Sequence, residues 1–207
     1  MVCATMLGAT CRNPIATADG MKYRHVILDR DGVLNVEADG GGYVRDPSEF
    51  QWIPGAIEAL ALLRRAGVHL SVATNQSGVG RGLMTLEQLE AVHDRMRTEA
   101  SRGGGALDTV VFCPHAPDAG CTCRKPAPGM LLEALELSGI PAAASLVVGD
   151  AQRDLEAAAR AGLQAALVRT GKGLETERLL GARRVPTYDD LSGLARAILS
   201  PAEHRVS

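Results

Sequence analysis

The feature that most constrains the fold is a regular alternation of short apolar, β-branched segments with longer segments of helical periodicity. The strand candidates are 25–28, 68–73, 109–112, 145–148 and 165–168. The helical candidates lie near 55–67, 85–101, 129–138 and 152–161, and the tail from Leu174 adds one further strand and a helix that starts near Asp189. This alternation predicts an α/β fold: a Rossmann-like open parallel sheet with helices on both faces.

The length of the chain sets the number of domains. A chain of 207 residues with 46% hydrophobic residues has room for one well-buried domain but not for two ordinary ones. We expect that domain to span 22–207. The segment 1–21 is polar, rich in Ala and Thr, and has no apolar core of the kind that marks a signal peptide. We therefore expect a disordered N-terminal extension and a cytoplasmic protein.

Charge and composition exclude two classes of partner. The formal net charge is −2, Lys and Arg form no basic stripe, and aromatic residues make up only 3% of the chain. Both observations argue against a nucleic-acid surface. No apolar run approaches the roughly 20 residues needed to span a bilayer. We therefore expect the protein to be a monomer that acts on a small molecule.

Polar side chains follow the predicted strands at the points where they end. Asp29 and Asp31 follow the first strand, Thr74 the second, Cys113 the third and Asp150 the fourth. In an open parallel sheet the ligand crevice lies beyond the carboxyl ends of the strands. Four separate strand ends that carry reactive groups therefore predict one site.

Asp29 and Asp31 project to the same side of an extended segment because they are two residues apart. Two carboxylates about 4 Å apart repel each other by about 4 kcal/mol at an effective dielectric constant near 20. A proton or a divalent cation must relieve this repulsion, and an oxygen-rich site that also meets phosphate suits Mg²⁺. Asp150 offers a third carboxylate. A simple Asp-capped turn is the alternative explanation, and the other strand ends argue against it.

Three cysteines and one histidine in the middle of the chain form a compact pattern. Cys113 and His115 form one pair, Cys121 and Cys123 form a second, and five residues separate the pairs. Three thiolates and one imidazole complete a tetrahedral Zn²⁺ site with no open position, which predicts a structural zinc ion. A disulfide or chance clustering would be the alternative. The zinc-stabilised loop would also fix the position of the Arg124-Lys125 pair that follows it.

Together these pieces resemble the four signature motifs of the haloacid dehalogenase (HAD) superfamily. Asp29-Arg30-Asp31-Gly32 is similar to the first motif, Thr74 to the second, Lys125 to the third, and Gly149-Asp150 with Asp154 to the fourth. The resemblance covers about 23–173. It implies an HAD-like fold, and because no large insertion separates the motifs, no large cap domain.

The resemblance also implies a mechanism and its metals. Asp29 would attack phosphorus and form an aspartyl-phosphate, and Asp31 would act as general acid and then general base. Thr74 and Lys125 would stabilise the charge on the transferred phosphoryl group. The catalytic Mg²⁺ would be held by Asp29, by the backbone carbonyl of Asp31 and by Asp150, with Asp154 orienting Lys125 or a metal-bound water.

Within the superfamily, the sequence is most similar to the heptose bisphosphate phosphatases. The matching pieces are 29–35, 42–44, 74–82, 123–130 and 169–172. This likeness implies removal of the 7-phosphate from a heptose 1,7-bisphosphate during synthesis of nucleotide-activated heptose, a precursor of lipopolysaccharide. It implies substrate contacts at Gly42, Tyr43, Asn75, Gln76, Ser77 and Arg124.

Two alternatives stay open at this point. The short zinc loop also resembles that of histidinol-phosphate phosphatases, so histidinol phosphate or another small phosphorylated metabolite is a second candidate substrate. A non-catalytic interaction module built on the zinc loop is a candidate from a different class. The intact Asp29, Asp31, Lys125 and Asp150 argue against that module.

Overall fold

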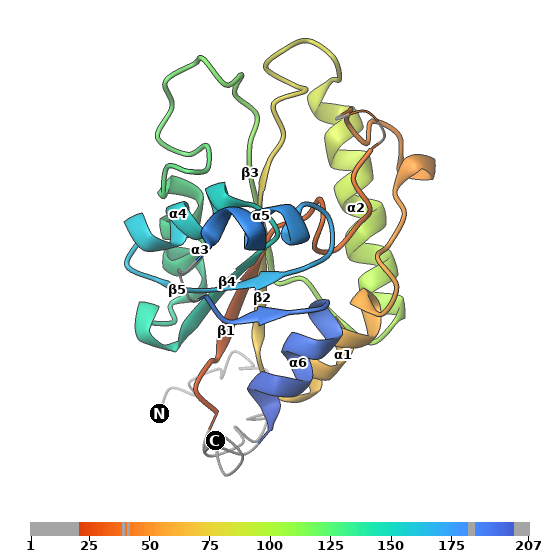
Figure 1. Ribbon diagram of the computed structural model, residues 1–207. Coiled ribbons are helices and arrows are strands. Elements are labelled where there is room, and N and C mark those ends of the chain that lie inside the picture. Colours follow the sequence, from red (N-terminus) through yellow and green to blue (C-terminus); the bar gives the residue numbers. More distant parts are fainter. Residues whose placement is uncertain (1–20, 39, 41, 182–184, 201–207) are drawn as a thin grey trace, which may run out of the picture.

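The computed structural model describes residues 21–38, 40, 42–181 and 185–200. At its centre lies a parallel six-stranded sheet in the order β3-β2-β1-β4-β5-β6 (Figure 1). The strands are β1 (His25–Leu28), β2 (His69–Asn75), β3 (Thr109–Cys113), β4 (Ser145–Gly149), β5 (Gln164–Val168) and β6 (Thr187–Tyr188). The predicted open parallel sheet is confirmed, whereas the predicted disorder of the N-terminal extension falls on 1–20, outside the described residues.

Six helices connect and flank the strands. They are α1 (Ala56–Arg65), α2 (Leu86–Arg102), α3 (Gly129–Ser138), α4 (Gln152–Arg160), α5 (Gly173–Leu180) and α6 (Leu191–Leu199). A capping box begins α2, where the side chains of Thr85 and Gln88 each accept a hydrogen bond from the other's backbone N–H. Helix α5 was not predicted: the sequence suggested a strand and one helix in the tail.

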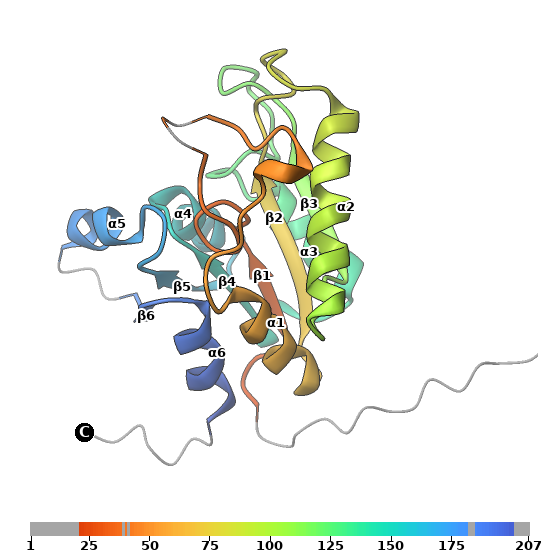
Figure 2. The same cartoon turned by 90° about the vertical axis from the view of Figure 1, so that its right-hand side faces the viewer.

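The two faces of the sheet carry different helices because alternate strand residues point to opposite sides. Val26 and Leu28 of β1 pack into the core beneath α1, α2 and α6. Ile27, between them, packs into the second core, which α3 and α4 cover. Figure 1 shows the strands with α3 and α4 on the left and α1 and α2 on the right, and Figure 2 looks onto the side that carries α1 and α2. The prediction of helices on both faces is therefore confirmed.

The path of the chain creates a crevice at the centre of the sheet. Leu28 at the end of β1 pairs with Val72 of β2 on one side and with Val148 of β4 on the other. The chain first builds β2 and β3 on one side of β1 and then β4, β5 and β6 on the other. Such a reversal of strand order leaves a ligand crevice beyond the carboxyl ends of the strands.

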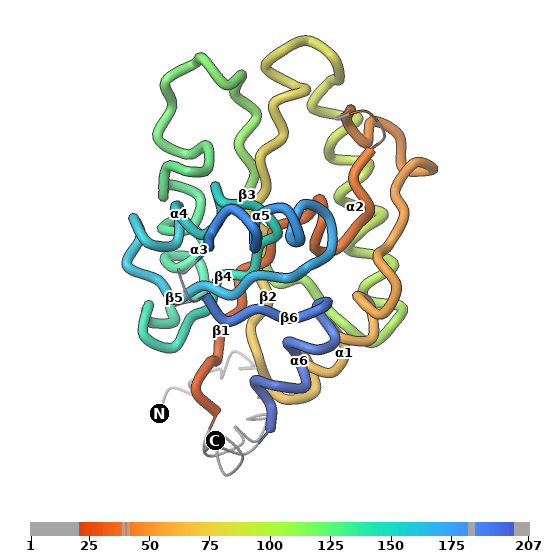
Figure 3. Tube along the Cα trace, in the orientation of Figure 1, coloured from red at the N-terminus to blue at the C-terminus, as the bar shows by residue number. Residues whose placement is uncertain are grey.

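Long loops surround that end of the sheet. Figure 3 traces the loops that follow β2 and β3 as they rise side by side from the same edge, together with the segment that follows β1. Within the described residues no inserted domain interrupts the strands, which agrees with the predicted lack of a large cap. No helix in the described ranges is long and apolar enough to cross a membrane.

Candidate active site

The carboxyl ends of β1 and β4 bring two of the predicted carboxylates together. The backbone N–H of Asp29 continues the ladder by donating to the carbonyl of Val148 (2.9 Å), so Asp29 directly extends β1. Asp150 directly follows β4. Ligand oxygens of Asp29, Asp150 and Asp154 all lie within 4.8 Å of one another, and all three residues are buried. Pairing of the two central strands therefore builds a buried triple-carboxylate cluster.

Lys125 supplies a cation to this cluster. Its Nζ lies 3.0 Å from Asp29 Oδ1 and 2.6 Å from Asp154 Oδ1, and it donates to the carbonyl of Ala73 (2.8 Å). Burial acts to lower the pKa of Lys125, but Asp154 and Asp29 outweigh it and raise that pKa. Lys125 is therefore a protonated, fully buried ammonium group between two carboxylates.

One cation does not neutralise three buried carboxylates. Burial raises the pKa of Asp150 to about 7, and the nearby Asp29 charge adds to the shift. Burial likewise raises the pKa of Asp29 to about 6, against the opposing effect of Lys125. Raised carboxylate pKa values in a buried cluster indicate that the site lacks positive charge. A divalent cation would supply it.

The two carboxylate oxygens of Asp150 have different surroundings: backbone atoms contact Oδ2, and Oδ1 is unpaired within the described ranges. Asp150 Oδ2 accepts from the backbone N–H of Lys172 (2.8 Å), whereas Oδ1 is buried and has no hydrogen-bond partner among the described residues. A Cβ atom at Gly32 or Gly171 would lie 2.1 or 2.2 Å from Asp150 Oδ2, and both glycines have positive φ. Only glycine allows this approach.

Asp31 has different surroundings from Asp29. Its two oxygens accept from Arg30 Nη2 (2.9 and 3.0 Å), and further bonds come from Asn35 Nδ2 (3.0 Å) and Gln76 Nε2 (2.8 Å). Burial alone would raise the pKa of Asp31, but the Arg30 charge and these donors hold it below its usual range. Gln76 Nε2 also donates to Thr74 Oγ1 (2.9 Å) and so links β2 to the first motif.

A pocket of about 150 Å³ opens beside these groups. All six residues predicted to contact substrate line it: Gly42, Tyr43, Asn75, Gln76, Ser77 and Arg124. Asn75, however, already uses both ends of its amide on the backbone of Lys125, donating to its carbonyl and accepting from its N–H (each 3.0 Å). In this structure Asn75 therefore positions Lys125.

Four charged residues that line this pocket had no predicted role: Arg30, Glu37, Arg153 and Lys172. Arg153 Nη2 lies 3.8 Å from Asp29 Oδ2, and Lys172 Nζ lies 2.6 Å from Glu37 Oε1. The matched segment 169–172 contained a signal for Lys172. For Arg153, the first turn of a helix that follows a strand-end Asp was the available signal. These cations make the pocket suitable for an anionic substrate.

A larger cavity of about 670 Å³ adjoins the pocket and shares Glu37, Ala38, Gly42 and Tyr43 with it. The Tyr43 hydroxyl lies 3.0 Å from Ser77 Oγ and accepts from Arg81 Nη1 (3.1 Å), which connects the segment after β1 to the loop after β2. The cavity offers space for the part of a substrate that lies away from the reacting phosphate.

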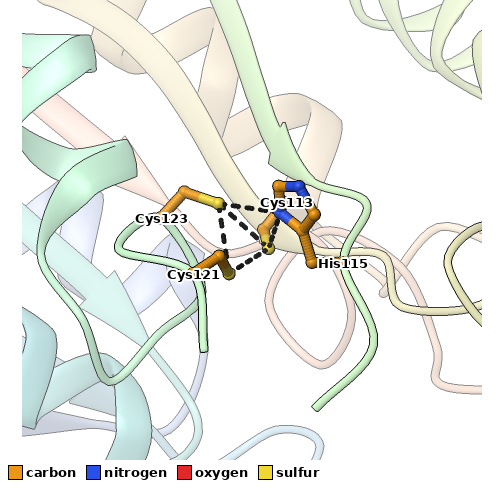
Figure 4. Close-up of side chains that lie close together, drawn as sticks. All are labelled: Cys113, His115, Cys121 and Cys123. Carbon is orange, nitrogen blue, oxygen red and sulfur yellow. Dashed lines mark hydrogen bonds between the residues drawn. The ribbon is translucent and has the colours of Figure 1, made fainter. Parts of the chain in front are cut away.

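The four zinc-ligand candidates converge on one point, as Figure 4 shows. The sulfur atoms of Cys113, Cys121 and Cys123 lie 3.2–3.6 Å apart, and His115 Nδ1 lies 3.5 and 3.2 Å from the sulfurs of Cys113 and Cys123. Disulfide sulfurs would lie about 2.05 Å apart, so all three cysteines are free thiols. The edge of a tetrahedral site with Zn–S bonds of about 2.3 Å is about 3.8 Å, close to the observed spacing.

Backbone hydrogen bonds connect the cysteine loop to the pocket wall. Gln76 N–H donates to the carbonyl of Cys113, and Gly80 N–H donates to the carbonyl of Pro114 (both 2.8 Å). Lys125 lies two residues after Cys123. The loop therefore supports both the Gln76 wall and the catalytic lysine candidate.

Comparison with known proteins agrees with this geometry. Residues 122–194 match the HAD-hydrolase-like family model. Proteins named D-glycero-beta-D-manno-heptose-1,7-bisphosphate 7-phosphatase are 44% identical in Pseudomonas putida and 45% identical in Pseudomonas aeruginosa. Each alignment covers 174 residues and 84% of this chain, with 98% and 97% of the relative.

Solved structures point the same way. The crystal structure of D,D-heptose 1,7-bisphosphate phosphatase from B. bronchiseptica, complexed with magnesium and phosphate, superposes with a TM-score of 0.80 at 41% identity, over 85% of this chain and 98% of that one. The enzyme from Burkholderia thailandensis gives a TM-score of 0.67 at 38% identity, over 86% and 99%. The chain therefore belongs to the D-glycero-beta-D-manno-heptose-1,7-bisphosphate 7-phosphatase family of HAD-like hydrolases.

Proposed function

We propose that this chain is a Mg²⁺-dependent phosphatase that removes the 7-phosphate of D-glycero-β-D-manno-heptose 1,7-bisphosphate through an aspartyl-phosphate on Asp29. The observation that carries the proposal is the contact of Asp29 with Lys125 beside the buried Asp150, at the crevice between β1 and β4. The β anomer and the 7-position come from the names of the relatives. The cationic pocket and the adjoining cavity offer space for a sugar with two phosphates.

The residues present fit a magnesium ion. Asp29 and Asp150 offer oxygens that are buried and close, and Asp150 Oδ1 lacks any other partner among the described residues. Asp29, Asp150 and the backbone carbonyl of Asp31 would hold the ion, since Mg²⁺ takes a few protein oxygens and completes its shell with water and phosphate. When bound, it would neutralise the carboxylates and the incoming phosphate.

The positions of the side chains support a covalent route in two steps. Asp29 attacks phosphorus, the bond between phosphorus and the sugar oxygen breaks, and Asp31 gives a proton to that oxygen; because its surroundings lower its pKa, Asp31 must first take up this proton when the anionic substrate binds. Lys125 and Thr74 stabilise the negative charge on the transferred group. Water then attacks the phosphorus of the aspartyl-phosphate while Asp31 takes its proton, which releases inorganic phosphate and regenerates the Asp29 carboxylate. Asp154, bonded to Lys125, orients the lysine.

The cysteine cluster fits a structural zinc ion. Four donors at nearly tetrahedral spacing leave no coordination position for water or phosphate, so zinc would act through geometry alone. Its effect would reach the site through Lys125 and through the Gln76–Cys113 backbone bond. Gly42, Tyr43, Gln76, Ser77 and Arg124 would contact the sugar phosphate, and we propose a single domain over 22–207 that acts as a monomer in the cytoplasm.

A substrate panel tests this function. Phosphate release is measured with both anomers of the heptose bisphosphate, with the heptose 7-phosphate and with histidinol phosphate. We expect the largest kcat/KM for the β bisphosphate. A larger kcat/KM for histidinol phosphate would assign the chain to the other substrate class, and no phosphate release from any of these compounds would favour a non-catalytic role.

A further inference from the structure

Arg30 is an unusual element of the site because its charge is entirely buried. The residue is 1% exposed and belongs to the largest fully buried side chains of the molecule. A buried guanidinium needs both a counter-charge and acceptors for its N–H groups. Its Nε and Nη2 donate to Asp31, and its Nη1 lies 3.2 Å from His93 Nε2 on α2.

The contact with Arg30 fixes the state of His93. A guanidinium only donates hydrogen bonds, so His93 Nε2 must accept and the ring proton must sit on Nδ1. The surroundings agree, because burial and the Arg30 charge lower the pKa of His93 to about 3 and keep the ring neutral. This tautomer leaves an N–H at Nδ1, a buried atom that has no hydrogen-bond partner among the described residues.

An unpaired buried N–H group destabilises the folded state, because it loses its hydrogen bonds to water and forms no other. His93 is completely buried, with its ring 5.5 Å from that of Phe112. An apolar side chain would fill this space without an unpaired polar atom. The hydrogen bond from Arg30 is therefore the one polar contact of the imidazole among the described residues.

We propose that His93 is a positioning residue that holds Arg30 from the α2 side and, through Arg30, fixes the carboxylate of Asp31 at the pocket. The inference rests on the proposed function, in which Asp31 is the general acid and base. Arg30 grips both oxygens of Asp31, so a rotation of the guanidinium moves the carboxylate with it. Proton transfer requires the acid within hydrogen-bond reach of the leaving oxygen, and a displacement of about 1 Å can cost about 100-fold in rate.

Two amide variants test this role. His93→Gln can place its carbonyl oxygen near the position of Nε2 and accept from Arg30, whereas His93→Asn is one methylene too short. We expect His93→Asn to lower kcat on the heptose bisphosphate by roughly 10- to 100-fold with little change in KM, and His93→Gln to stay within a few-fold of wild type. His93→Phe, which keeps a ring but no acceptor, should behave like His93→Asn. Equal kcat for Asn and Gln variants, or a wild-type kcat for His93→Asn, would overturn the proposal.

A substrate whose leaving group needs no proton distinguishes a misplaced Asp31 from a general loss of active-site structure. An aryl phosphate leaves without protonation, so the first burst of nitrophenol from p-nitrophenyl phosphate reports attack by Asp29 alone. In His93→Asn this burst rate should match wild type within a few-fold, although steady-state turnover falls. A burst that slows as much as sugar-phosphate turnover would mean that the site has collapsed, and it would overturn the positioning role. A His69→Gln control changes a histidine of β2 at the opposite end of the sheet and should keep wild-type kcat.

A wrong substrate assignment can be distinguished from a wrong role for His93. If wild type releases no phosphate from heptose bisphosphate but shows the nitrophenol burst, the substrate assignment is wrong and the His93 test proceeds with the substrate that the panel selects. The burst and the difference between the Asn and Gln variants would then still decide the role of His93.

Discussion

The carboxylate cluster and the cysteine cluster are both built to hold a metal, but they are assembled in opposite ways. Asp29 and Asp150 come from two strands far apart in the sequence and meet only because β1 pairs with β4. The cysteine cluster comes from one stretch, 113–123, in which Cys113 is buried, Cys121 and Cys123 are partly exposed and His115 is exposed. The first cluster depends on the whole sheet, whereas the second organises a loop that has little regular structure of its own.

The two clusters also differ in what they leave unsatisfied. Burial, together with the charges of neighbouring carboxylates, raises the pKa values of Asp29 and Asp150. The four zinc-ligand candidates form a closed set at spacings suited to one ion. A cluster with an unpaired carboxylate oxygen can bind a catalytic ion, whereas a closed set of four donors suits a structural one. Variants that affect only the carboxylate cluster or only the cysteine cluster test this difference.

The largest effect is expected at Asp29. Asp29→Asn keeps the shape of the side chain but removes the nucleophile, so kcat should fall by at least about 10⁴-fold. Zinc content and thermal unfolding should stay near wild type, because Lys125 keeps Asp154 as its counter-charge. Phosphate release, elemental analysis and circular dichroism measure these quantities, and the exposed Asp94→Asn serves as a matched control. Folded Asp29→Asn with more than about 1% of wild-type kcat would rule out the covalent route.

The next effect concerns magnesium. Asp150→Asn should raise the Mg²⁺ concentration for half-maximal activity by about 100-fold, because a charged ligand is lost, and even outer-shell partners of metals are worth about 10–100-fold. Brief treatment of wild type with EDTA should stop activity, and added Mg²⁺ should restore it while the zinc content stays unchanged. Activity that persists in EDTA after dialysis contradicts a catalytic Mg²⁺.

A smaller effect on activity, but a larger one on structure, is expected from the cysteine cluster. Cys123→Ser should lose zinc, lower the thermal midpoint and reduce kcat by about 10-fold, because the ion no longer fixes the loop that leads to Lys125. The neighbouring Thr122→Ser should change none of the three. Stoichiometric zinc in Cys123→Ser, or no zinc in the wild type, would show that the four donors do not form a zinc site.

The smallest effect is expected where the two regions meet. Asn75→Ala removes both hydrogen bonds to the Lys125 backbone and should cost about 1–2 kcal/mol of unfolding free energy together with a few-fold loss of kcat. KM should stay near wild type, because the amide faces Lys125. A rise in KM at constant kcat would instead indicate that Asn75 contacts substrate, as the sequence suggested. Chemical denaturation and steady-state kinetics provide the measurements.

The sequence supported the sheet and most of the site because both leave local signals. Short β-branched runs that end in polar residues predicted the strands and the convergence of Asp29, Thr74 and Asp150 on one edge. Helix α5 escaped because it begins at Gly173 and has no side-chain cap, so nothing in its first turn marks a start. Strand β6, which pairs with β5 at the edge of the sheet, was predicted without bounds because it has only two residues.

The supporting contacts of the site could not be predicted in the same way. Nothing in the sequence links His93 to Arg30, because the two residues lie 63 positions apart. The hydrogen bonds of Asn75 to the Lys125 backbone depend on how two loops meet, so the sequence predicted a substrate contact for Asn75 but not this second role. Residue type and spacing predict which chemistry gathers at a strand end, whereas the partner of each buried polar group depends on three-dimensional packing.

The central position of β1 has a consequence for biosynthesis. Its first neighbour, β2, is made early, but its second neighbour, β4, ends only at Gly149. A chain that emerges from the ribosome can therefore pair β1, β2 and β3 while one edge of β1 stays open and Asp150 is still missing. The nascent protein would be unable to hydrolyse phosphate esters until about three quarters of it has been synthesised. In this period β1 has an unpaired edge, the kind of surface on which another chain can pair and start aggregation.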